Sequence, residues 1–171
     1  MKNLDWFIDK GLLARSGGMR NMAGNYMRKA RQNIVTMELL NRAREFRDEL
    51  ELPEDYEPDE WVVIAAYYAM YMASLAVLAR FGLKSRNHTA TIMALEEIFV
   101  RKRLLEKKYV AIIEKTRLRV EEIEKLEDVR KRREIAQYSP TKDTTREMAE
   151  KSRKDAHEFA DRMEGLFDSI G

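Results

Sequence analysis

The stretch that decides the fold is residues 61–79, WVVIAAYYAMYMASLAVLA, which contains no charged residue. A helix that is apolar on every side is buried on every side, either in a protein core or in a membrane. The length alone would allow a membrane span. Three tyrosines and a serine interrupt the apolar surface, however, and no second segment of this kind accompanies it. We therefore expect no membrane insertion, and predict that this segment is the central helix of a bundle.

Small residues along this segment favour close helix packing. Ala65, Ala69, Ala73 and Ala76 recur at helical spacing and form one stripe. A stripe of small side chains lets the backbone of a neighbouring helix come near. Gly82 follows the segment and is predicted to end the helix, because glycine adopts the left-handed conformation common after a helix C-terminus.

Helical periodicity also precedes the central segment. Residues 19–50 are predicted to form one amphipathic helix, since apolar residues recur there every three or four positions. The expected core face of this helix is Ala23, Tyr26, Ala30, Asn33, Met37 and Leu40. Pro53 and Pro58, within an acidic run, indicate a connector between the two helices.

Three more helical stretches follow the central segment. The first is predicted over residues 88–103, with Asn87 or Ser85 as its cap. The second is expected to reach about residue 137, and the last begins at a capping box formed by Thr144 and Glu147. Their predicted core seams are Tyr109, Ile113, Thr116, Val120 and Ile123, and then Ala149, Ser152, Ala156, Phe159, Met163, Leu166 and Ile170. No alternating pattern typical of a strand appears.

The predicted fold class is therefore all-α, an antiparallel bundle of about five helices. Residues 1–18 are interpreted as an N-terminal extension and residues 19–171 as the bundle domain. The chain has no cysteine, which excludes disulfides and thiol chemistry and suggests a reducing, cytoplasmic location. No phosphate-binding loop, dinucleotide motif or zinc-protease motif is present. We expect no cofactor and no metal site.

Charge is distributed unevenly along the chain, although the formal net charge is only +2. Residues 1–36 carry 7 basic and 2 acidic residues, and residues 37–60 carry 3 and 10. Residues 101–134 carry 13 basic and 8 acidic residues. Local potential, rather than the total charge, attracts a polyanion. The small net charge therefore does not exclude nucleic acid as a ligand.

The segment with the most chemical information is residues 129–138, VRKRREIAQY. Four consecutive basic residues occur there, Arg130, Lys131, Arg132 and Arg133. Cations near a helix C-terminus are favoured by the helix dipole, which explains such a cluster without any function. Arg133 can also clamp a phosphate with two hydrogen bonds.

Three stretches of the chain resemble the HEPN-domain family, in its small prokaryotic type often encoded beside a minimal nucleotidyltransferase. The first is AAYYAMYMASLAVLARFGL, and the second is the sequence from Ser85 to His88 with the helix behind it. The third is RREIAQYSPTKD followed by the last amphipathic helix. The resemblance covers about residues 61–171 and implies a four-helix up-and-down core.

The resemblance also implies a site. Ribonucleases of the family are similar in having an Arg and a His separated by four to six residues, with residues of two subunits lining one cleft. Arg133 matches the Arg, whereas Tyr138 stands where the His is expected. A phenol with a pKa of about 10 is a poor base at neutral pH, but it can bind a phosphate or stack on a base. The catalytic candidates are thus Arg133 and Tyr138.

We interpret the chain as an RNA- or nucleotide-binding protein, a homodimer, and the partner of a nucleotidyltransferase in a toxin–antitoxin-like pair. Arg130, Lys131, Arg132, Asn33 and His88 are the candidate nucleic-acid-binding residues. His88 has a structural interpretation as well, as a neutral capping or packing residue at a helix start. Two alternative functions stay open, a metal-independent ribonuclease using Arg133 and a non-catalytic dimerisation or protein-interaction module.

Overall fold

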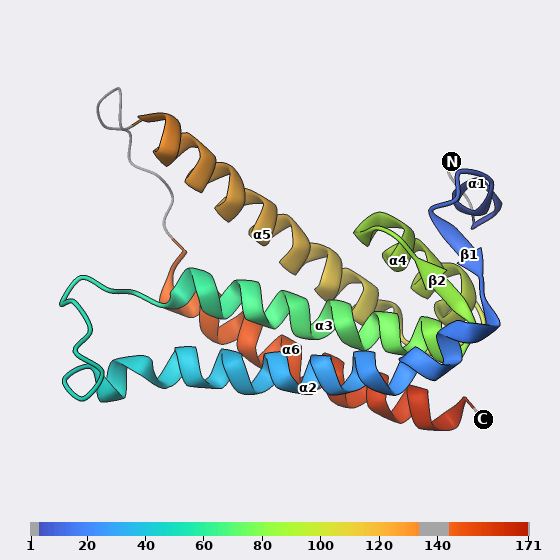
Figure 1. Cartoon of the computed structure of the whole chain (residues 1–171), viewed down its shortest axis with the longest axis horizontal. Coiled ribbons are helices and arrows are strands. Elements are labelled where there is room, and N and C mark those ends of the chain that lie inside the picture. The colour runs from blue at the N-terminus through green and yellow to red at the C-terminus, as the bar shows by residue number, and fades with distance from the viewer. Residues whose placement is uncertain (1–3, 134–143, 171) are drawn as a thin grey trace.

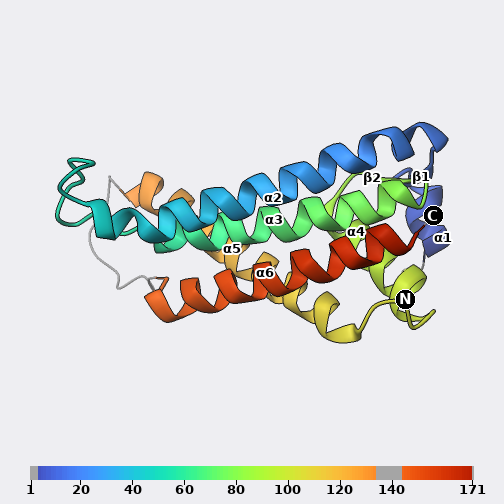
Figure 2. The same ribbon diagram turned by 90° about the horizontal axis from the view of Figure 1, so that it is seen from below.

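The computed structural model describes residues 4–133 and 144–170, with side chains described to residue 125 and from residue 144. Four long helices form the bundle: α2 (Arg20–Arg42), α3 (Asp59–Arg80), α5 (Lys107–Arg133) and α6 (Arg146–Ser169). Figures 1 and 2 show α2, α3 and α6 side by side, while α5 diverges from α3 towards its C-terminal end. Each of the four long helices runs opposite to the one before it in the chain, so α3 and α6 run in the same direction. The predicted all-α antiparallel bundle is confirmed.

Helix α3 lies at the centre, as its composition predicts. It packs against α2, α5 and α6, and all four alanines of the small-residue stripe are buried. Trp61, half exposed, is one of the few large side chains of α3 that reach solvent. Among the described helices, α3 is the one long and apolar enough to cross a membrane, and most of it is buried inside the protein.

The predicted seams of the last two long helices are also confirmed. Tyr109, Ile113, Thr116, Val120 and Ile123 are buried on α5. On α6 the predicted residues from Ala149 to Leu166 are buried, while Ile170 is partly buried at the end. The N-cap of α6 is Thr145 rather than Thr144, because the Thr145 hydroxyl accepts a hydrogen bond from the amide of Met148.

The first long helix differs from the prediction in two ways. Its core face is Ala23, Met27, Ala30, Ile34 and Met37, so the expected Tyr26, Asn33 and Leu40 lie at the edge of that face. The helix also ends at Arg42, and residues Ala43–Phe46 (η2) form a 3-10 turn instead. This turn places Arg44 beside the start of α3, where its guanidinium lies 2.6 Å from a carboxylate oxygen of Asp59.

Short elements close the end of the bundle opposite that connector. Helix α1 (Leu4–Asp9) places Phe7 in the core, and strand β1 (Leu13–Arg15) pairs antiparallel with β2 (Leu83–Ser85). A two-stranded sheet was not expected from the sequence, because three residues are too few to show an alternating pattern. The sheet ties residues 4–18 to the turn after α3, where Gly82 has the predicted positive φ of 80°.

The segment after β2 forms a short α-helix followed by a π-helical segment, rather than one uniform α-helix. Helix α4 (His88–Ala94) is capped by Asn87, whose side-chain oxygen accepts from the amide of Ala90 at 2.7 Å. It continues as a π-helical turn, η3 (Leu95–Val100), before the chain reaches α5. The predicted Asn87 cap is confirmed. The helix ends a little before the predicted residue 103, where Arg103 adopts a positive φ of 59°.

Candidate functional site

A groove runs between α4 and α5, beside the central helix. It contains two adjoining hollows of about 220 Å³ and 80 Å³, and Arg117 of α5 lines both. The larger hollow is lined by Thr89, Ile92, Met93, Glu96, Val110, Glu114 and Arg117. The smaller is lined by Tyr67, Tyr68, His88, Arg117, Val120, Glu121 and Glu124. A single arginine thus connects the apolar part of the groove with a cluster of aromatic and titratable side chains.

His88 lies at the wall of the smaller hollow, held between two tyrosines of α3. Its Nδ1 forms a hydrogen bond with the hydroxyl of Tyr67. The ring of Tyr71 lies against the same imidazole, with the ring centroids 4.2 Å apart. Tyr67 and Tyr71 are four residues apart on one face of α3, so one helix presents both rings to the start of α4.

The environment of His88 keeps the imidazole neutral. Burial lowers its pKa below the usual 6.5, and the positive charge of Arg117 lowers it further. Burial also raises the pKa of the Tyr67 phenol, so that the hydroxyl stays protonated and can donate to Nδ1. In that arrangement the imidazole carries its proton on Nε2. The prediction that His88 is neutral is supported, with burial rather than the helix dipole as the main cause.

Arg117 is only partly satisfied by the protein. One terminal nitrogen, Nη1, pairs with the carboxylate of Glu121 one turn later on α5. Its Nε is buried and has no hydrogen-bond partner within the described part of the chain. A buried donor without a partner carries a free-energy cost, which an oxygen of a bound anion would remove. Among the described residues, Arg117 is the one cation that lines the two hollows, against four glutamates, Glu96, Glu114, Glu121 and Glu124. Because its Nε is buried, an anion reaches that N–H group only if the side chain moves.

The residues predicted from sequence fall in different places. His88 lies in the groove, as described, but Asn33 does not line either hollow. Asn33 lies on α2 and donates to the carbonyl of Lys29 at 2.9 Å, an ordinary bond within its own helix. The structure does not bring Asn33 and His88 together in one described cavity. The role of Asn33 in binding nucleic acid stays a prediction.

The basic segment continues α5 beyond the groove. Arg130, Lys131, Arg132 and Arg133 form the last residues of the helix, and their side chains lie outside the described part of the structure. Tyr138 lies entirely outside the described residues. The distance between Arg133 and Tyr138 is therefore not defined. What is defined is that one helix carries both Arg117 and the basic residues.

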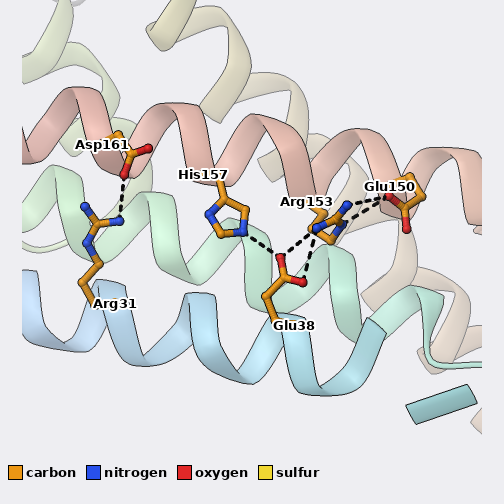
Figure 3. Close-up of polar contacts among 6 residues, drawn as sticks. All are labelled: Arg31, Glu38, Glu150, Arg153, His157 and Asp161. Carbon is orange, nitrogen blue, oxygen red and sulfur yellow. Dashed lines mark hydrogen bonds and ion pairs between the residues drawn. The ribbon is translucent and has the colours of Figure 1, made fainter. Parts of the chain in front are cut away.

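A second polar cluster joins α2 and α6 on another face of the bundle, and Figure 3 shows it. Glu38 accepts hydrogen bonds from Arg153 at 3.0 Å and from His157 Nε2 at 2.6 Å. Arg153 also pairs with Glu150, so that its charge is shared between two carboxylates. The charged groups here are matched with one another. We interpret this cluster as a connection between helices rather than as a ligand site.

Sequence reasoning did not identify Arg117 or Tyr67 as site residues. Arg117 is one of 32 basic residues and directly follows a buried seam position, so its type and spacing give no signal. The three tyrosines of residues 61–79 are visible in the sequence as a group, and Tyr67 is 3% exposed. What the pattern does not reveal is the histidine against which they pack, because it lies on another helix.

The fold and the groove define an all-helical bundle with an apolar central helix and a polar groove along one neighbouring helix. The family model for the HEPN domain matches residues 36–166, which is most of the chain. The chain therefore belongs to the HEPN-domain family, whose members are generally associated with nucleotides or RNA. Comparison with curated proteins and with solved structures gave no match.

Proposed function

We propose that this protein binds RNA along the groove between α4 and α5. The observation that carries the proposal is Arg117, whose buried Nε lacks a partner beside the neutral His88. A phosphate oxygen would satisfy this N–H group, and charge-assisted bonds from guanidinium to phosphate are among the stronger hydrogen bonds. The apolar wall formed by Ile92, Met93 and Val110 offers a surface on which an unpaired base can lie.

The length of α5 favours a polynucleotide over a single nucleotide. Lys131 follows Arg117 by fourteen residues, which corresponds to about 21 Å along a helix at 1.5 Å per residue and to nearly the same helix face. A mononucleotide cannot reach both positions, whereas several linked nucleotides can. Phosphates at Arg117 and at the basic residues 130–133 would place one RNA strand along the helix. Asn33 has no part in this proposal.

The experiment is an RNA-binding titration at several salt concentrations. Arg117→Gln keeps a polar side chain but shortens it and removes the charge. It should weaken binding and reduce the salt slope by about one, as expected for the loss of one phosphate contact. Arg28→Gln is the matched control, because Arg28 is exposed on α2 and its guanidinium donates to Asn25 within the same helix turn. Equal binding by wild type and Arg117→Gln would refute the proposal.

A second function, RNA cleavage without metal, is favoured by one specific observation. A neutral imidazole can accept a proton at neutral pH, as Tyr138 cannot without a large pKa shift. In His88 the accepting nitrogen is Nδ1, so a proton from RNA would pass through the Tyr67 hydroxyl that is bonded to it. His88 would then replace the missing histidine as the proton-transfer group. Incubation of structured RNA with wild type, His88→Gln and Arg133→Ala in the presence of a chelator tests this function. Cleavage that persists in His88→Gln would exclude His88 from this role.

The family membership motivates two finer proposals, a homodimer and a nucleotidyltransferase partner in a toxin–antitoxin-like pair. A dimer would let residues of two subunits line one RNA-binding cleft. Light scattering at high protein concentration tests the dimer, and a monomer there would remove the two-subunit cleft. Isolation of the protein from its own cells tests the partner, through the identity of the proteins and RNA that remain bound to it.

A further inference from the structure

Another cavity lies away from the α4–α5 groove, at the end of the bundle closed by the two strands. Its volume is about 510 Å³, within the usual range for small-molecule sites. Three parts of the chain meet there: the N-terminal segment from α1 to the start of α2, the turn after α3, and the π-helical turn η3. The N-terminal segment lies outside the region matched by the family model. Half of the residues that line the cavity thus come from outside the matched region and half from within it.

Three cations line the cavity without a carboxylate partner. Arg15, Arg20 and Lys102 come from separate parts of the sequence, and in the described portion of the chain none of them forms an ion pair. Glu97 also lines the cavity, but its carboxylate pairs with Arg101 at 2.6 Å. The excess charge in the cavity is therefore positive. Like charges brought together raise the local potential, and this favours an anionic ligand.

The position of Arg20 is defined by the backbone of Gly82. A Cβ atom built on Gly82 would lie 3.6 Å from Arg20 Nε and 3.7 Å from Arg20 Nη2, so the guanidinium lies over the face of that glycine. Ser16 and Gly17 line the same side of the cavity, and the Ser16 side chain makes no capping hydrogen bond. The first turn of α2 contains no acidic residue that would repel an anion. The hydroxyl and the guanidinium can therefore bind oxygens of one anion.

The rest of the lining is apolar or aromatic. Leu4 and Ile8 of α1, Leu83 of β2 and Ile98 of η3 contribute aliphatic side chains. Phe81 is 40% exposed, and Lys102 Nζ lies 5.6 Å from its ring centroid. A second aromatic ring can stack on the exposed part of Phe81 while an anion reaches the neighbouring cations. The cavity thus has a charged side and an apolar side, unlike the α2–α6 cluster, in which the charges are matched.

We propose that this cavity binds a small phosphate monoester with an aromatic body. The phosphate lies against Arg20, Lys102 and the Ser16 hydroxyl, and the aromatic ring packs on Phe81. A free inorganic phosphate would use only the charged side, and a neutral aromatic molecule only the apolar side. Both are therefore expected to bind more weakly than the ester.

Isothermal titration calorimetry on the full chain tests the proposal with four probes: phenyl phosphate, uridine monophosphate, uridine and inorganic phosphate. We expect one site for at least one of the two esters, with affinity at least about tenfold above that for uridine or phosphate. The double variant Arg20→Ala/Lys102→Ala and, separately, Phe81→Leu should each weaken ester binding by about tenfold or more. Arg28→Ala on α2 is the control and should bind as wild type. Circular dichroism confirms that each variant is folded, which is expected because Arg20 and Lys102 are exposed.

Several results would overturn the proposal. These are the absence of binding by both esters at millimolar concentration, equal binding by inorganic phosphate, or unchanged ester affinity in the double variant. Arg117→Gln separates this cavity from the RNA groove. Loss of ester binding in Arg117→Gln would assign the ligand to the groove and refute the cavity. If Arg117→Gln binds the ester but no longer binds RNA, the result would support two separate sites, one in the cavity and one in the groove.

Discussion

The hydroxyl of Tyr67, on the central helix, is hydrogen-bonded to Nδ1 of His88, at the start of α4. This contact connects the most buried helix of the protein to the wall of the α4–α5 groove. It defines which ring nitrogen of His88 faces the core and which remains for another partner. Because the phenol stays protonated, the contact also favours the neutral imidazole, in which Nδ1 accepts.

His88 should titrate below the ordinary histidine pKa of 6.5, because burial and the charge of Arg117 disfavour the imidazolium. The pKa is measured by an NMR titration of the two histidines, assigned with His157→Gln. Arg117→Gln removes the positive charge that lowers this pKa, while Glu121 and Glu124 still raise it, so the pKa of His88 should increase. Arg28→Gln should leave it unchanged. A pKa at or above 6.5 in wild type would contradict the described environment of His88.

The lowered pKa of His88 also predicts that the stability of the protein depends on pH. The unfolded chain takes up the His88 proton near pH 6.5, whereas the folded chain takes it up only at lower pH. The unfolded state therefore binds more protons as the pH falls below 6.5, and the free energy of unfolding decreases there. His88→Gln should lack this part of the dependence. Chemical denaturation at pH 7.5 and pH 5.5 measures the difference for the two proteins.

The lowered pKa of Glu38 predicts a separate decrease in the free energy of unfolding in more acidic solution. Burial raises its pKa, but hydrogen bonds from His157 and Arg153 outweigh burial, so the pKa lies below the usual 4.5 (Figure 3). A carboxyl with a lowered folded-state pKa stabilises the protein above the unfolded pKa, and this contribution is lost as the pH falls through the folded pKa. Glu38→Gln should cost about 1 kcal/mol at pH 7.

Comparison of Glu38→Gln with wild type between about pH 5 and pH 3 tests this explanation. The two unfolding free energies should converge as the pH falls, because the variant has no carboxyl to protonate at position 38. Glu49→Gln, at an exposed position outside the helices, is the control and should follow wild type throughout. A constant difference between Glu38→Gln and wild type down to pH 3 would show that the carboxylate charge is not the cause.

Much of the fold could be predicted because the dominant signals are local. An uncharged segment of this length, residues 61–79, has to be buried, and the seams of α5 and α6 follow directly from helical spacing. The end of α2 was predicted several residues too late for a tertiary reason. Arg47 donates to the carbonyls of Glu54 and Tyr56, so residues beyond Arg42 fold back onto the connector. Periodicity alone does not reveal such a contact.

The candidate site was less predictable, because it combines residues from three helices. His88 was recognised as a candidate, but its partners Tyr67 and Arg117 are distant in sequence and belong to common residue types. Asn33 was selected for being polar on an apolar face, although the face is centred one residue away, at Ile34. The strands β1 and β2 were missed because each is three residues long. The functional roles of the basic residues 130–133 and of Tyr138 stay predictions.

The pair formed by Arg44 and Asp59 should be important for stability, because both side chains are largely removed from solvent. Their side chains are 17% and 10% exposed, and they lie 2.6 Å apart. Asp59→Ala leaves the guanidinium without its buried partner and should cost about 3 kcal/mol, measured by chemical denaturation. Glu57→Ala is the matched control. Glu57 also pairs with Arg44, but it is 59% exposed, so its loss should cost below about 1 kcal/mol.

Two glycines should respond to the same substitution with opposite signs. Gly82 has a φ of 80°, in the left-handed region that disfavours a side chain, so Gly82→Ala should destabilise the protein by about 1 kcal/mol. Gly24 lies within α2, and no atom lies within 4 Å of a Cβ built on it. Alanine has the higher helix propensity, so Gly24→Ala should stabilise the protein by up to about 1 kcal/mol. Thermal unfolding of both variants beside wild type measures the two shifts. A stabilising Gly82→Ala would contradict the described turn, and a destabilising Gly24→Ala would indicate that the exposed face of α2 at this position is covered in solution.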